Sequence, residues 1–190
     1  MWVLGIDASS TGVGFCRLPI DEEYGPEVTW FGAVGEPLER VVALGRQASE
    51  RYRAMVWHYG DPLAVAIEAP FFRGPASATL AMAQGAVLAG LNLPLARKHV
   101  PPVFSYAPQE VRAEWRVLPV RRGAGEWGES NKPDAWLHLP RAAAKAIGDW
   151  VANEWPDPTC TAARGAAGDM ADAFFVAHRL RRTINDEAKP

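Results

Sequence analysis

The sequence predicts an α/β protein with a three-layer fold, in which a mixed central sheet is flanked by helices. The chain opens on two apolar runs joined by a tight turn, which indicates a β-hairpin. A later continuous apolar run is typical of a central parallel strand that is covered on both faces. Long helical patterns alternate with the strands. At 190 residues the chain can bury a real core, and we expect one domain over 1–182 followed by a polar tail at 183–190.

The N-terminal elements follow from apolar runs and from the turn residues that bound them. The run from Trp2 to Ile6 ends at Asp7 and predicts a buried strand. The small and polar residues 8–12 predict a tight turn, after which 13–18 predicts the second strand of the hairpin. The segment 28–34, bounded by glycines and a proline, predicts a third strand.

Two helices and two strands are predicted for the middle of the chain. The pattern from Glu39 to Tyr59 places apolar residues on one helical face. The segment 63–67 predicts a buried strand, and it ends in a carboxylate, Glu68. An Ala-rich helix over 76–91 and a short strand over 103–106 follow.

The last third of the chain is predicted to be helical with intervening loops. Proline opens a short helix at 108, and the glycine-rich segment after it predicts a loop. The expected elements are, in order, a helix at 108–115, a loop at 116–131, a helix from Pro133 or Arg141 to about Trp155, a loop at 157–168 and a helix at 169–182.

Composition favours a protein that works in the cytoplasm without a membrane partner. Cys16 and Cys160 are the only cysteines and lack zinc-site spacing, so we expect reduced thiols. No apolar run approaches the roughly 20 residues of a membrane helix, and the N-terminal residues lack the basic region of a signal peptide. A net charge of −2 is low for a DNA-binding protein. Acids that bind metal contribute to that total, and a local basic face can coexist with it.

Four acids are the candidate functional residues. Asp7 and Glu68 each end a buried apolar strand, where α/β sheets bind their ligands. Asp169 and Asp172 are three residues apart on a predicted helix, so both can face one point. Converging carboxylates repel one another unless cations lie between them. Oxygen ligands without His or Cys favour Mg²⁺ or Mn²⁺, and two such ions about 3.5–4 Å apart can cleave a phosphodiester.

Each acid taken alone also has a structural interpretation. Asp7 precedes two serines and could be a turn residue, and Asp169 could cap a helix N-terminus. Glu68 is harder to explain in this way, because an acid at the end of an apolar strand costs free energy. The four together favour a metal site.

Five short motifs carry a resemblance that spans nearly the whole chain. They are Gly5-Ile6-Asp7 with Ser9–Gly14, Ala66-Ile67-Glu68 with Phe71, Leu80 with Gln84-Gly85-Ala86, Pro102–Ala107 with Val111-Arg112, and Asp169–Ala173. In this order they resemble the motifs of RuvC-type Holliday junction resolvases. The resemblance implies an RNase H-like fold, a RuvC-like nuclease domain over 1–182, two Mg²⁺ ions or Mn²⁺ in their place, and a homodimer that makes paired nicks in a four-way junction or related branched DNA.

The resemblance also assigns roles to individual residues. The catalytic and metal-binding acids are Asp7, Glu68, Asp169 and Asp172. The expected DNA-binding residues are Phe71, Phe72, Arg73, Arg112 and Lys132, with Lys132 also catalytic. Phe71 falls where the family has an aromatic wedge that enters the junction, whereas Phe72 is expected to pack beneath its loop. The Ala-rich helix 76–91 is expected at the dimer interface, through Ala78, Ala81, Ala86 and Ala89.

Two other functions compete with the nuclease. The N-terminal motif also resembles the phosphate loop of actin-like and sugar-kinase proteins, but a second domain and a second phosphate loop are missing from the sequence. A non-catalytic protein that binds branched DNA is the other alternative; retaining four acids next to phosphates disfavours it. The abundance of Ala, Arg, Gly, Pro and Trp suggests a high-GC genome, such as that of a phage, which would place the protein in the host cytoplasm.

Overall fold

The computed structural model describes residues 1–21, 24–69, 76–92, 101–108, 110–111 and 139–187. The described elements are, in chain order, β1 (Trp2–Ala8), β2 (Gly12–Pro19), β3 (Glu27–Gly32), α1 (Pro37–Tyr59), β4 (Val65–Glu68), α2 (Ala76–Asn92), β5 (Val103–Tyr106), α5 (Arg141–Glu154) and α6 (Thr161–Glu187).

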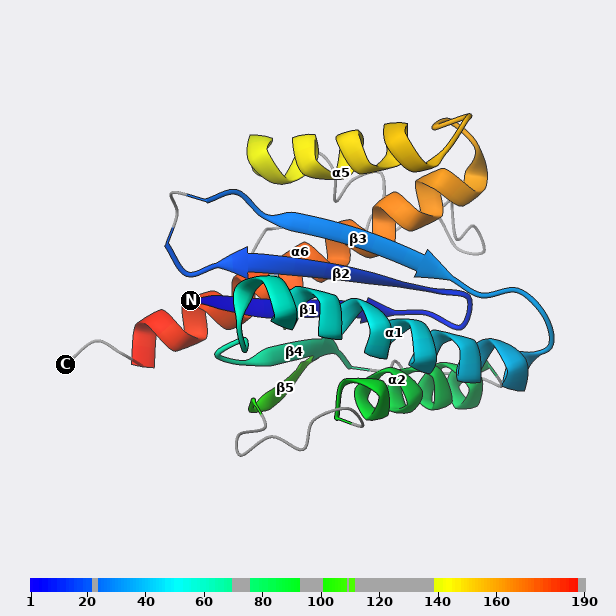
Figure 1. The fold of residues 1–190 in the computed structure, drawn as a ribbon, viewed down its shortest axis with the longest axis horizontal. Helices are drawn as coiled ribbons and strands as arrows, with labels where there is room; N and C mark the ends of the chain where they lie inside the picture. Colours follow the sequence, from blue (N-terminus) through cyan, green and yellow to red (C-terminus); the bar gives the residue numbers. More distant parts are fainter. Residues whose placement is uncertain (22–23, 70–75, 93–100, 109, 112–138, 188–190) are drawn as a thin grey trace, which may run out of the picture.

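The strands form one mixed sheet in the order β3-β2-β1-β4-β5 (Figure 1). β1 pairs antiparallel with β2, and β2 with β3, as the hairpin pattern predicts. β4 lies parallel to β1 and β5 lies parallel to β4. The long apolar run before Glu68 is therefore an interior parallel strand, as predicted.

Alternation along the strands divides the core between the two faces of the sheet. On β1, Leu4 and Ile6 pack in a cluster that includes the buried side of α1 and α2. Val3 packs in a second cluster with α5 and α6. In Figure 1, α1 lies in front of the sheet and α6 runs behind it. This arrangement confirms the predicted three-layer α/β fold.

The main error in the predicted elements concerns α6, which begins at Thr161 and not at Asp169. The predicted loop at 157–168 is therefore wrong from residue 161 onward. Gly165 and Gly168 lower the helix propensity of this segment, but the alanines between them favour a helix, and their small side chains are buried against the core. The helix also continues to Glu187, so residues 183–187 of the predicted tail are helical.

The other predicted boundaries agree closely with the structure. α5 begins at Arg141, the later of the two candidate starts. Residues 108, 110 and 111 are helical, and the rest of the predicted 108–115 helix and of the 116–131 loop lies outside the described residues. Among the helices that the structure describes, none has both the length and the apolar character needed to cross a bilayer.

Candidate active site

Strand alternation places Asp7 and Glu68 on the same face of the sheet. Ile6 of β1 pairs with Ile67 of β4 in a parallel register, and each acid is the residue that follows. Both isoleucines belong to the cluster under α1 and α2. Because consecutive side chains point to opposite faces, both acids point to the face covered by α6. The two carboxylates therefore lie side by side at the ends of adjacent strands.

Two glycines allow α6 to lie directly on this face. A Cβ added to Gly5 of β1 would be 2.2 Å from the carbonyl oxygen of Ala173. A Cβ added to Gly14 of β2 would be 2.3 Å from the carbonyl oxygen of Asp169. No larger residue fits at either position without moving the helix. The glycines of the N-terminal motif thus bring Asp169 and Asp172 to the strand ends.

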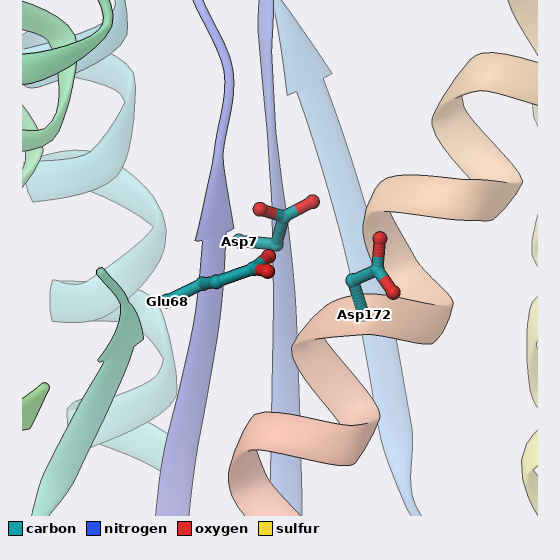
Figure 2. Close-up of side chains that lie close together, drawn as sticks. All are labelled: Asp7, Glu68 and Asp172. Carbon is teal, nitrogen blue, oxygen red and sulfur yellow. The ribbon is translucent and has the colours of Figure 1, made fainter. Parts of the chain in front are cut away.

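Asp7, Glu68 and Asp172 form the acidic triad of the site. One carboxylate oxygen from each lies within 4.8 Å of the others. Figure 2 shows Asp7 and Glu68 extending from two strands and Asp172 facing them from α6. Their exposed fractions are 9%, 9% and 6%.

Three buried carboxylates at this spacing repel one another unless positive charge lies between them. A donor set made only of oxygen atoms suits a hard divalent cation such as Mg²⁺ or Mn²⁺. The residues of the acidic triad therefore fit a divalent metal site.

Asp169 is also buried, with 5% of its surface exposed, but it has a different environment. Among the described residues, the metal-compatible group comprises the acidic triad and does not include Asp169. The Nε1–H of Trp30, on β3, donates to its Oδ2 at 3.0 Å. The spacing of Asp169 and Asp172 thus places both on the sheet side of α6, but only Asp172 joins the triad.

The structure excludes two of the structural interpretations of the acids. Asp169 lies well inside α6, so it does not cap the N-terminus of that helix. The turn after β1 is closed by Ser9, whose Oγ accepts a hydrogen bond from the backbone N–H of Gly12 at 3.0 Å. Asp7 lies within β1 itself.

Two side chains that support the acids were assigned no role from the sequence, although Gln84 belongs to one of the five motifs. Trp30 was unremarkable as an aromatic residue in a strand. Gln84 of α2 is 6% exposed, and its Nε2 donates to the carbonyl oxygen of Glu68 at 3.0 Å. The signal for Gln84 was present, because a polar residue in an Ala-rich buried helix needs a hydrogen-bond partner. The sequence carries no comparable signal for Trp30.

The structure does not describe the predicted DNA-binding residues. Phe71, Phe72, Arg73, Arg112 and Lys132 all lie outside the described residues. Their roles stay predictions.

The fold is that of solved Holliday junction resolvases. T. thermophilus RuvC, solved in complex with a Holliday junction substrate, superposes with a TM-score of 0.54 at 19% identity, over 98% of this chain and 96% of that one. The yeast mitochondrial Holliday junction resolvase Ydc2 superposes with a TM-score of 0.51 at 14% identity, over 95% of this chain and 77% of that one. No protein-family model matches the sequence, and no curated protein does. The similarity confirms the predicted RNase H-like fold.

Proposed function

We propose that this chain is a metal-dependent, structure-selective DNA endonuclease that resolves Holliday junctions. The acidic triad carries the proposal, because three buried carboxylates meet at the strand ends of a resolvase-like fold. A protein that only bound DNA would gain affinity by losing these acids, since they repel phosphates.

In this proposal, the four acids hold two Mg²⁺ ions, and Mn²⁺ can replace them. Bound divalent cations supply the Lewis acidity that activates water and neutralises charge at the scissile phosphate. Asp7 and Glu68 are fixed by their strands, and Asp172 is fixed by the close contact of α6 with the sheet. This rigidity keeps the ligands in place before substrate arrives, which is the condition for efficient electrostatic catalysis.

The basic and aromatic residues complete the proposed site on the DNA side. Arg112 and Lys132 contact the backbone of the cut strand, and Lys132 stabilises charge in the transition state. Phe71 acts as a wedge that unstacks bases at the junction. Phe72 and Arg73 support this contact from the same segment. These assignments rest on the resemblance of the sequence motifs.

A homodimer through α2 would provide the two active sites that paired nicks require. The outer face of α2 carries a stripe of small and apolar residues, named here the α2 stripe: Ala78, Met82, Gly85 and Ala89, all exposed. Ala78 and Ala89 of the predicted interface belong to this stripe, whereas Ala86 is half-buried and lies against Gly45 of α1 in the same chain. The expected setting for the reaction is the cytoplasm, or the host cytoplasm if a phage encodes the protein.

Cleavage of labelled DNA tests the proposal. A four-way junction, a flap and a plain duplex are incubated with the purified protein in Mg²⁺, in Ca²⁺ and in EDTA. We expect paired nicks in the junction with Mg²⁺ and binding without cutting in Ca²⁺, whose looser coordination aligns the reacting groups poorly. Asp7→Asn protein is the control for contaminating nucleases. Junction binding without cutting in Mg²⁺ would instead support the non-catalytic binder, and indifference to junctions would refute both.

A further inference from the structure

Trp30 connects the edge of the sheet to the acidic site. It lies on β3, opposite Gly14 of β2. Its indole N–H donates to Asp169 Oδ2 at 3.0 Å across 139 residues of sequence.

The indole ring of Trp30 is held firmly on the sheet. Gly12 and Gly32 are paired across β2 and β3, and added Cβ atoms would lie 2.4 Å and 2.3 Å from atoms of the ring. The ring therefore lies over both glycines, where no side chain separates it from the backbone. Trp150 and Trp155 pack against it, with ring centroids 6.5 Å and 6.0 Å away. These contacts fix the direction in which the indole N–H points.

We propose that Trp30 is a positioning residue of the metal site, which fixes the orientation of the Asp169 carboxylate and thereby sets the affinity for cations. The inference rests on the proposed role of Asp169 as a ligand. Hydrogen bonds to ligating carboxylates restrict their rotation, and losing such a partner typically costs 10–100-fold in metal affinity or activity. An indole suits this task because it donates a hydrogen bond without carrying a positive charge that would compete with the cation.

Calorimetric titration of Mg²⁺ without DNA tests this role. Trp30→Phe keeps an aromatic ring and removes the donor, and we expect its dissociation constant for Mg²⁺ to rise by about 10-fold. Trp2→Phe is the matched control. Trp2 also donates its indole N–H to a backbone carbonyl, that of Gly60 at 3.2 Å, and it lies at the opposite end of β1 from Asp7. Its loss should leave Mg²⁺ affinity unchanged.

A double-mutant cycle separates positioning from a general structural effect. If Trp30 acts through Asp169, Trp30→Phe should weaken Mg²⁺ binding little or not at all in the Asp169→Asn background. An equal loss in both backgrounds would overturn the proposal, as would an unchanged dissociation constant in Trp30→Phe alone.

A spectroscopic measurement on the unsubstituted protein covers the case in which Trp30→Phe fails to fold. With ¹⁵N-labelled tryptophan, the Trp30 indole resonance should shift when Mg²⁺ is added, and the absence of a shift would overturn the proposal. None of these readouts involves cleavage. Mg²⁺ binding that depends on Trp30, in a protein that cuts no DNA, would support this inference and refute the nuclease. DNA cutting with a Mg²⁺ affinity independent of Trp30 would support the nuclease and refute this inference.

Discussion

Gly14 of β2 lies against the backbone of Asp169 in α6, and a Cβ on Gly14 would be 2.3 Å from the Asp169 carbonyl oxygen. Gly5 makes the same kind of contact with Ala173 one strand away. The helix that carries two of the proposed ligands is therefore positioned by backbone contact with the sheet. A shift of α6 would move Asp172 away from Asp7 and Glu68.

Replacing Gly14 with alanine should destabilise the protein and impair cleavage together. The added methyl group must push α6 outward, and overpacking of this kind costs about 1–3 kcal/mol. Urea unfolding would measure the stability and junction cleavage the activity. Gly148→Ala is the control, since Gly148 lies in α5 with nothing within 4 Å of an added Cβ, and it should be neutral or stabilising by up to about 1 kcal/mol. Equal behaviour of the two variants would contradict the role of Gly14.

Removing the charge of a single triad acid should abolish nicking. Asp7→Asn, Glu68→Gln and Asp172→Asn keep the side-chain shape and lose a ligand. Losing a group that only hydrogen-bonds to a metal ligand costs up to about 100-fold in activity. Because these variants lose the ligand itself, we expect activity to fall by more than about 100-fold. Asp169→Asn should be milder. Single-turnover cleavage of a four-way junction measures the effect.

The same substitutions should have the opposite effect on stability without metal. Removing one of three mutually repelling buried carboxylates relieves that repulsion, so each variant should melt at a higher temperature than the unsubstituted protein in EDTA. Asp149→Asn, at an exposed position in α5, is the control for both measurements. A fully active Asp7→Asn protein would exclude the proposed site.

Gln84 should affect the site through the backbone of Glu68. Gln84→Leu removes the buried donor to the Glu68 carbonyl, which should cost about 1–3 kcal/mol of stability and lower Mg²⁺ affinity. Gln47 of α1 provides a matched control, because its Nε2 donates to the carbonyl of Gly32 at 3.1 Å. Gln47→Leu should lower stability and leave Mg²⁺ affinity unchanged. Loss of Mg²⁺ affinity in both variants would indicate a general effect of destabilisation.

Much of the fold and of the triad could be predicted because local patterns determine them. Apolar runs bounded by turn residues give the strands, and an acid at the end of a buried run is costly without a function. Asp7 and Glu68 are therefore recognisable from their immediate neighbours. Their shared face follows from strand alternation once the parallel pairing of β1 and β4 is known.

The rest depends on contacts between distant residues that carry no local signal. The hydrogen bond from Trp30 to Asp169 requires both the position of β3 at the sheet edge and the path of α6 across it. The start of α6 was missed for a different reason. Gly165 and Gly168 lower helix propensity, but burial of the alanines beside them outweighs this local preference.

Binding to DNA should depend strongly on salt, despite the net charge of −2. Contacts between phosphates and basic residues release counterions, so affinity should fall linearly on a log–log scale with rising salt. Arg112→Ala and Lys132→Ala should each reduce that slope by about one unit. Fluorescence anisotropy with a labelled junction, in Ca²⁺ to prevent cutting, measures the slope. Arg141→Ala, at the exposed start of α5, is the control. Affinity that does not respond to salt would contradict phosphate binding.

The α2 stripe should mediate dimerisation, so a charge within it should produce monomers. Met82 is 50% exposed near the middle of α2, and Met82→Glu would place two like charges close together across a two-fold axis. We expect sedimentation to show a shift from dimer to monomer, and cleavage to change from paired nicks to single nicks. Trp57→Glu is the control, because Trp57 is an 88% exposed apolar residue on α1, outside the stripe. A Met82→Glu protein that remains dimeric would refute this interface, and an unsubstituted protein that is monomeric and makes paired nicks would refute the need for a dimer.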